Sequence, residues 1–255
     1  MKARSQSSSI RTRRSRTART SNRDRPWTCR QCLAELRRLG SRKNVEGMAR
    51  FGIRAKKVYG VSKPQIDDLA KRIGKSHSLA LQLWKSGVHD ARILAGMVDR
   101  AELVTAAQMD RWVRDFNNWD VCDGTCCHLF AHTVYAWRKA LAWSRRSGEF
   151  QKRAGFALMA YLAVHDKRAP DHKFVKLLPI LRREAADGRN FVRKAINWAL
   201  RQIGKRNLKL NGAAILEAER IRKIDSRATR WIAADALREL RGEAVRRRLR
   251  QKPTK

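Results

Sequence analysis

Acidic residues and long apolar runs are both scarce in this sequence. Its 255 residues include 23 Asp and Glu against 59 Lys and Arg, which gives a formal charge of +36 at pH 7. No segment approaches the roughly 20 apolar residues that a membrane-spanning helix needs. The first 26 residues lack the apolar core of a secretory signal. We therefore expect a protein that stays inside the cell and has no membrane partner.

Cysteine is also sparse, and its pattern argues against disulfides. Five cysteines, an odd number, occur in a chain that is 43% hydrophobic and can build a core without cross-links. Cys29 and Cys32 form a CxxC pair, but a structural zinc site needs four ligands and the next cysteine is Cys122. This pair could bind a metal ion, or it could be two ordinary thiols near the start of a helix. We predict ordinary thiols and no metal site.

Positive charge is what the sequence has in excess, and it is not confined to the ends. Residues 1–25 hold nine Lys/Arg and one Asp, and residues 241–255 hold seven and one Glu, so residues 26–240 keep about +22 of the +36. This composition predicts a disordered basic tail over 1–25, a folded body over 26–241 and a basic C-terminal tail over 242–255. An organellar transit peptide shares the Ser/Arg-rich composition of residues 1–25 but needs an apolar face that is missing here. The polycationic body favours nucleic acid as partner.

The apolar residues recur at helical spacing and show no strand-like alternation, which predicts an all-α fold. Predicted helices include Cys32–Leu39, which ends at Gly40, one that starts after Ser62 and Pro64, Leu79–Lys85, and His89–Val98. Three later segments share one layout, a basic pair followed by a small or aromatic apolar stripe. When Arg153, Lys194 and Arg230 are aligned, the periods are 41 and 36 residues, with partner helices at 174–186 and 212–224. Such helix pairs bury their apolar faces by stacking, so we predict a right-handed α-solenoid of HEAT-like helix pairs.

Basic residues recur on the second helix of each predicted pair. Because the second helices line the concave side of a solenoid, the sequence predicts a basic concave groove. The alternative is that these side chains simply coat solvated helix faces. The candidate DNA-binding residues are Arg92, Arg153, Arg193, Lys194, Arg201 and Arg230.

An acidic turn, Asn118–Asp123, interrupts this basic chain. Trp119 and Asp123 are four residues apart and share one face of a helix that opens at Asn118 or Trp119. A carboxylate amid basic residues repels phosphate and suits a cationic ligand. In the structural alternative, Asn118 or Asp120 caps the helix and Trp119 anchors the core. We expect Asp120 to lie on a different face and to cap the helix. We assign five other tryptophans to the core: Trp84, Trp112, Trp137, Trp143 and Trp231.

From about Gly47 to Leu240 the chain resembles the HEAT-like-repeat DNA alkylation repair proteins, alkylpurine DNA glycosylases of the AlkD type. The motifs that carry the resemblance are Tyr59–Val61 with Pro64, Leu83–Arg92, Gln108 and Met109 with Trp112, Trp119–Asp123, Phe150–Arg153, and Ala195–Arg201. The resemblance implies a lesion contact by Trp119 and Asp123, a second pair in Trp198 and Arg201, and a phosphate contact by Arg153. The family also has an aromatic before a Met in its first helix. Here Gly47 precedes Met48, so that contact is absent or is supplied by Phe51 or Tyr59.

The resemblance implies excision of N3- or N7-alkylated purines from duplex DNA, without metal or organic cofactor. Asp123, Trp119 and Trp198 are the candidate catalytic residues, and duplex DNA with alkylated purines is the expected partner. We expect a monomer, placed in the cytoplasm near the nucleoid if the source is bacterial. Two alternatives stay open: a non-catalytic solenoid that binds damaged or structured nucleic acid, and a scaffold for acidic proteins.

Overall fold

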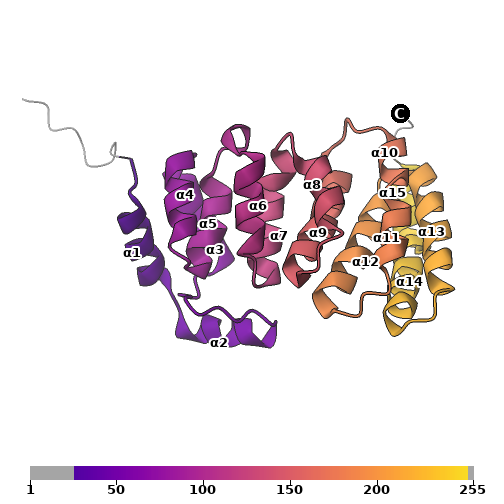
Figure 1. Cartoon of the computed structure of the whole chain (residues 1–255), viewed down its shortest axis with the longest axis horizontal. Coiled ribbons are helices and arrows are strands. Elements are labelled where there is room, and N and C mark those ends of the chain that lie inside the picture. The colour runs from indigo at the N-terminus through magenta and orange to yellow at the C-terminus, as the bar shows by residue number, and fades with distance from the viewer. Residues whose placement is uncertain (1–25, 252–255) are drawn as a thin grey trace, which may run out of the picture.

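The computed structural model describes residues 26–251, and all regular secondary structure in that range is helical (Figure 1). The predicted tail over 1–25 lies outside the described residues. No helix within 26–251 is long and apolar enough to span a membrane. The elements are α1 Cys29–Leu39, α2 Arg42–Arg50, α3 Lys63–Ile73, α4 His77–Lys85, α5 His89–Val98, η1 Ala101–Leu103, α6 Ala106–Arg114, α7 Trp119–His128, η2 Phe130–His132, α8 Ala136–Trp143, α9 Glu149–His165, α10 Asp171–Val175, α11 Leu178–Glu184, α12 Asn190–Gly204, α13 Leu208–Arg222, α14 Arg227–Leu240 and α15 Glu243–Arg250.

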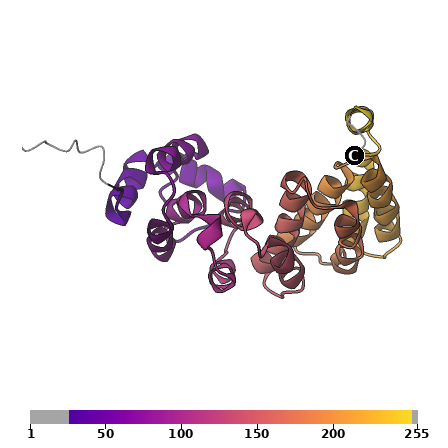
Figure 2. The same cartoon turned by 90° about the horizontal axis from the view of Figure 1, so that it is seen from above.

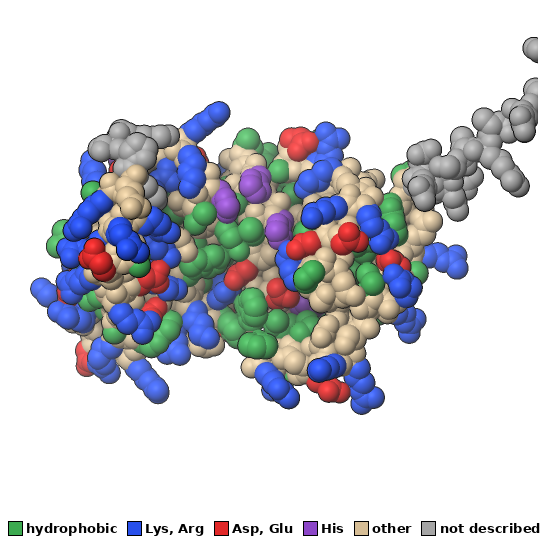
Figure 3. All heavy atoms as spheres, turned by 180° about the vertical axis from the view of Figure 1, so that it is seen from behind, with side chains coloured by type: hydrophobic (Ala, Val, Ile, Leu, Met, Phe, Trp, Pro, Cys, Tyr) green, Lys and Arg blue, Asp and Glu red, His purple; other side chains and the backbone are tan. Residues whose placement is uncertain are grey.

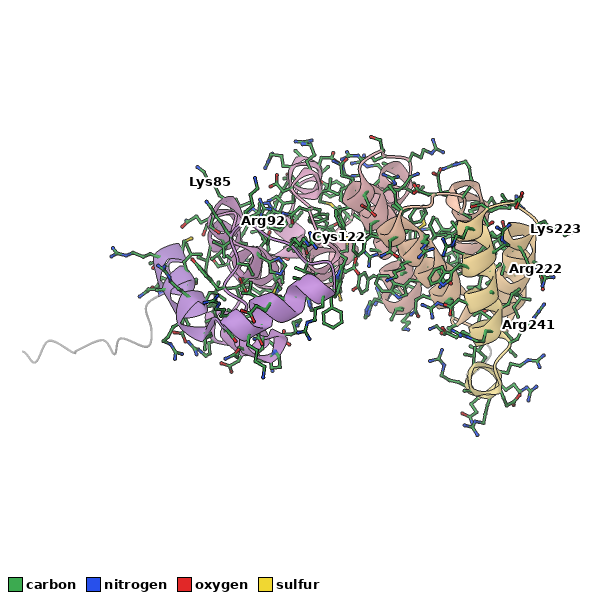
Figure 4. All side chains as sticks on the ribbon, turned by 90° about the horizontal axis from the view of Figure 1, so that it is seen from below. Lys85, Arg92, Cys122, Arg222, Lys223 and Arg241 are labelled. Atoms are coloured by element: carbon green, nitrogen blue, oxygen red, sulfur yellow. The ribbon has the colours of Figure 1, made fainter. Side chains whose placement is uncertain are left out.

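These helices form stacked pairs, which confirms the predicted all-α solenoid. One layer consists of α5, α7, α9, α12 and α14, and each of these packs against the next. Outer helices such as α4, α8 and α13 pack against their partners in this layer. The stack is curved, and α2 and α15 stand on the same side of it, near its two ends (Figures 2 and 4). That side is the concave face.

Local sequence signals fix the helix ends. Ser62 begins α3 with a capping box completed by Gln65, and Asn118 begins α7 by accepting a hydrogen bond from the backbone N–H of Val121 at 3.0 Å. Gly155 allows α8 and α9 to touch closely, because a Cβ atom there would lie 2.4 Å from the backbone nitrogen of Ser144. The predicted helices are present, except that the partner helix predicted at 174–186 is divided into α10 and α11; α2, α8 and α15 were not predicted.

Aromatic side chains form much of the core in the first half of the stack. Trp84 and Trp112 stack with ring centroids 3.9 Å apart, and Trp143 is fully buried, so these three core predictions are confirmed. Trp137 is half-buried and donates its N–H to Asp166. The core prediction for Trp231 is wrong: it is 36% exposed. Its helix follows α12 near the end of the stack, where its ring meets the Arg193 guanidinium at 5.0 Å instead of a further helix.

Ion pairs connect successive helix pairs. Lys152 on α9 binds Glu184 at 2.7 Å and Asp187 at 3.1 Å, and Arg189 binds Asp187 at 2.6 Å. Burial alone would raise the pKa of Asp187, but hydrogen bonds from Arg189 and Lys152 outweigh burial and lower it to about 2. These charges are therefore part of the framework that fixes α9 relative to α12.

The CxxC pair and the C-terminal segment have defined surroundings. Cys32 is fully buried, and burial raises the pKa of its thiol to about 11, so it is a poor metal ligand at neutral pH. No group of His, Cys, Asp and Glu within residues 26–251 is arranged to hold a metal ion. The segment predicted as a basic C-terminal tail begins with a helix, α15, whose Leu249 is buried.

Candidate functional site

Two adjoining cavities open on the concave face. The first has a volume of about 430 Å³ and the second about 460 Å³, and Trp119, Arg153 and Lys194 line both. The remaining lining residues of the first are Lys63, Asp120, Asp123, Gly124, Cys127, His128, Tyr161 and Trp198. Figure 3 shows this face: apolar side chains with a few Asp, Glu and His residues lie across its middle, and Lys and Arg crowd its C-terminal end. The site thus has an apolar and partly acidic centre.

Asp123 and Arg153 form the ion pair at the base of the first cavity. Arg153 donates from Nε to Oδ1 at 2.8 Å and from Nη2 to Oδ2 at 2.6 Å, and its Nη1 donates to the carbonyl of Phe191 at 2.7 Å. Arg153 is 7% exposed, so the predicted phosphate contact would have to be made by a guanidinium that already donates three hydrogen bonds. Burial raises the pKa of the Asp123 carboxyl, and Arg153 offsets part of that rise.

Two indole rings line the same cavity as this carboxylate. Trp119 and Trp198 both line the first cavity, one turn before Asp123 on α7 and on α12 respectively. Trp119 donates its Nε1–H to the carbonyl of Phe51 at 2.9 Å, and Trp198 rests edge-on against Tyr161 with centroids 4.9 Å apart. The structure therefore brings the three predicted catalytic residues to one cavity, with both rings held by neighbours.

Asp120 has a different place from the one expected. Asn118, not Asp120, caps α7, and Asp120 lines the same cavity as Asp123. The expectation that it faces elsewhere is wrong, because Asp120 and Asp123 are three residues apart on α7 and are therefore neighbours on its surface. Asp120 is hydrogen-bonded at 3.2 Å to His89 Nε2, and His89 Nδ1 lies 3.4 Å from the Asn118 amide. The cavity therefore holds two carboxylates.

The end of α2 forms the wall of the second cavity. Phe51 and Gly52 line it with Phe191, and Phe51 is 70% exposed. Gly52 has a φ of +76°, and a Cβ there would lie 3.0 Å from the Phe191 ring. Tyr59, the other proposed substitute for the missing aromatic, does not line either cavity. Of the two, the structure brings Phe51 to the site.

Four of the predicted basic residues lie outside these cavities, with partners of their own. Arg92 donates to the carbonyl of Asp115 at 3.1 Å and lies 5.3 Å from the Trp84 ring. Arg201 pairs with Glu239, Arg230 pairs with Asp225 at 2.6 Å, and Arg193 covers Trp231. Lys194 is exposed and lines both cavities, while exposed Lys63 lines the first and exposed Arg50 the second. A DNA-binding role for the other four stays a prediction.

Sequence reasoning missed several cavity residues, although the helical period points to some of them. Cys127 follows Asp123 by four residues, and Gly124 and His128 follow Asp120 at four and eight residues. Burial lowers the pKa of His128 and raises that of Tyr161, so neither is charged at neutral pH. No sequence pattern pointed to Lys63 as a cavity residue, because it comes from α3 on another repeat.

Comparison with known proteins supports this assignment of the fold and the family. A solved structure described as "A new family of proteins related to the HEAT-like repeat DNA glycosylases with affinity for branched DNA structures" superposes with a TM-score of 0.72 at 19% identity, covering 88% of this chain and 96% of that chain. A search of curated proteins gave no match. The family model of the DNA alkylation repair enzymes matches residues 32–240. This chain therefore belongs to the DNA alkylation repair enzyme family.

Proposed function

We propose that this protein is a DNA glycosylase that excises cationic N3- or N7-alkylated purines from duplex DNA. The observation that carries the proposal is that Asp123, Trp119 and Trp198 line one cavity on the concave face of a polycationic solenoid. A carboxylate at that position does not stabilise an undamaged phosphodiester, which is negatively charged. It does stabilise a positively charged nucleotide.

The cavity offers several attractions to a cation. The indole faces of Trp119 and Trp198 each contribute about 0.5–2 kcal/mol toward a cation held against them. Asp120 and Asp123 add two carboxylates, of which Asp123 is fixed by Arg153 and cannot turn away when the ligand arrives. A group that is held in place before reaction stabilises developing charge without reorganisation.

The chemistry asked of these residues is modest. In an N3- or N7-alkylated purine the base already carries a positive charge, so the glycosidic bond breaks with its electron pair moving to the base, which leaves neutral. Positive charge then develops on the sugar at C1′. We assign to Asp123 the stabilisation of that charge and the orientation of a water molecule, whose oxygen bonds to C1′ and which releases a proton to solvent.

The remaining groups at the two cavities suit the DNA backbone and the bases. Lys194 supplies an exposed positive charge beside both cavities, and Phe51 presents an exposed aromatic ring at the second. We assign phosphate binding to Lys194 and a stacking contact to Phe51. The wider set of predicted DNA contacts, Arg92, Arg153, Arg193, Arg201 and Arg230, belongs to this same proposal.

A second candidate is binding of branched DNA without excision. It is favoured by one observation, the affinity for branched DNA stated for the protein whose structure superposes on this one. That candidate needs the concave face and its basic residues but no carboxylate at the centre. Asp123 therefore separates the two candidates.

The test is release of bases from methylated duplex DNA. Purified protein in excess over a duplex treated with a methylating agent should release 3-methyladenine and 7-methylguanine, measured by chromatography against a heated control without protein. Asp123→Asn protein at the same concentration should release far less. If the native protein binds a four-way junction tightly and releases no base, the branched-DNA candidate replaces the glycosylase.

A further inference from the structure

The helix α15 is the most densely basic element among the described residues. Four of its eight residues are arginine, Arg246, Arg247, Arg248 and Arg250, and all four are exposed. Its one carboxylate, Glu243, lies 3.8 Å from Arg250. The helix begins after residue 240, where the match to the family model ends. It therefore lies outside the part of the chain that the family model matches.

Three of the four arginines of α15 differ from most arginines of α13 and α14 in having no carboxylate partner among the described residues. On α13 and at the end of α14, Arg222 and Arg241 bind Glu219 at 2.7 and 2.6 Å, and Arg238 pairs with Asp235. Within residues 26–251, no ion pair is formed by Arg246, Arg247 or Arg248. Positive charge on α13 and α14 is largely neutralised inside the protein, and on α15 it is not.

The packing of α15 determines which faces are free. The helix contacts α13 and α14, and it buries Leu249 with Val245, four residues earlier, partly buried on the same face. The apolar face is therefore already covered, and the arginines occupy the remaining faces. A membrane-binding helix needs an apolar face left over for lipid, which α15 does not have.

The position of α15 places these charges beside the candidate DNA site. It stands out from the body at the C-terminal end, on the same side as α2, whose Phe51 lines the second cavity (Figures 2 and 4). Figure 4 shows Arg222, Lys223 and Arg241 at this same end, and Lys85 on the opposite side of the molecule. A duplex lying along the concave face meets α15 at that end.

We propose that α15 is a second DNA-binding element, which holds the phosphate backbone of the bound duplex at the C-terminal end of the concave face. This proposal rests on the proposed function only in that the same duplex is bound, and it does not require excision of a base. Arginines free of internal partners bind phosphate at little structural cost and release counterions when they do so. We expect α15 to raise affinity without regard to sequence or damage.

The test compares two variants of the full-length protein that each lose three positive charges. The first carries Arg246→Gln, Arg247→Gln and Arg248→Gln, and it keeps Leu249. The matched control carries Lys85→Gln, Arg111→Gln and Arg114→Gln, exposed residues of α4 and α6 without an ion-pair partner within residues 26–251. Affinity for an undamaged duplex of about 30 base pairs is measured by fluorescence anisotropy across a salt series, and circular dichroism checks that both variants are folded.

Log K falls as log salt rises, and each lost phosphate contact makes this slope less steep by about 0.9. The slope of the α15 variant should therefore be less steep by about 2–3, and its affinity should fall roughly 10- to 100-fold at moderate salt. The control should stay close to the native protein. The assay uses undamaged duplex and needs no excision, so a failure of excision in the native protein overturns the proposed function and not this inference. Equal slopes for the two variants would overturn the proposal that α15 binds DNA. The proposal would also be overturned if the α15 variant lost binding to vesicles of anionic lipid while its DNA affinity stayed unchanged.

Discussion

The replacement Asp123→Asn tests the proposed chemistry most directly, because it keeps the size of the side chain and removes its charge. The native carboxylate accepts two hydrogen bonds from Arg153, at 2.8 and 2.6 Å. Loss of a preorganised charged group costs a catalyst about 10²–10³-fold in rate, or about 2.7–4 kcal/mol. We expect single-turnover excision of 7-methylguanine at saturating protein to slow by about that factor.

The same replacement also perturbs the fold, and the two effects have to be separated. Arg153 is 7% exposed, and removal of one partner from a buried ion pair costs about 3–5 kcal/mol of unfolding free energy. The thermal midpoint of Asp123→Asn should therefore fall, and the kinetic assay must be run well below it. The variant should still bind undamaged duplex as tightly as the native protein or more tightly, since a negative charge near phosphate is gone.

A double variant provides the control. Asp123→Leu with Arg153→Met replaces both charges by apolar groups, and such replacements are often neutral or stabilising. It should recover much of the lost thermal stability while excision stays as slow as in Asp123→Asn. If the stable double variant excises at the native rate, or if Asp123→Asn does so while Asp120→Asn is inactive, Asp123 is the wrong carboxylate.

Three further predictions concern pH and stability. Because burial raises the pKa of Asp123 above its ordinary 3.8 and the ionised form is the active one, excision should fall as pH is lowered through that raised pKa, and the residual activity of Asp123→Asn should lack this acid limb. The pKa of Asp187 is lowered from 3.8 to about 2, so its stabilisation is present above 3.8 and is lost as pH falls toward 2. Asp187→Asn should therefore cost about 1 kcal/mol at pH 7 after allowance for solvent screening, or about 2–4 °C in the thermal midpoint, and a cost that stayed the same down to pH 2 would contradict the reasoning. Gly155→Ala places a Cβ 2.4 Å from the Ser144 backbone and should destabilise by about 1–3 kcal/mol, whereas Gly212→Ala, which meets nothing within 4 Å, should leave the midpoint unchanged or raised; equal midpoints for the two variants would refute the close approach of α8 and α9.

The fold was predictable because its signals are local. Ser62 and Asn118 cap their helices as their types and positions suggest, and the layout around Arg153, Lys194 and Arg230 recurs because each helix pair buries a similar face. The helical period also brought Trp119 and Asp123 to one face. These inferences need only neighbours within a few turns or one repeat.

The partners of the charged side chains were not predictable in this way. Arg153 meets Asp123 across 30 residues, and Arg201 meets Glu239 across 38. Any of the 23 carboxylates was a possible partner for any of the 59 basic residues, and the sequence carries no rule for the choice. The same limit explains why the contact of Arg92 with Asp115 was not predicted.

The internal pairing changes what the net charge means for binding. Carboxylates are scarce, and the ion pairs Asp110 with Lys139, Glu184 with Lys152 and Glu239 with Lys205 place them between helices from different repeats. Their scarcity leaves unpaired cations such as those of α15 at the edge of the concave face. Asp123 is the exception, because it joins α7 to α9 and also faces the cavity. If it served only to join the helices, an apolar pair would replace it without loss of function, and that is the outcome that the double variant is designed to detect.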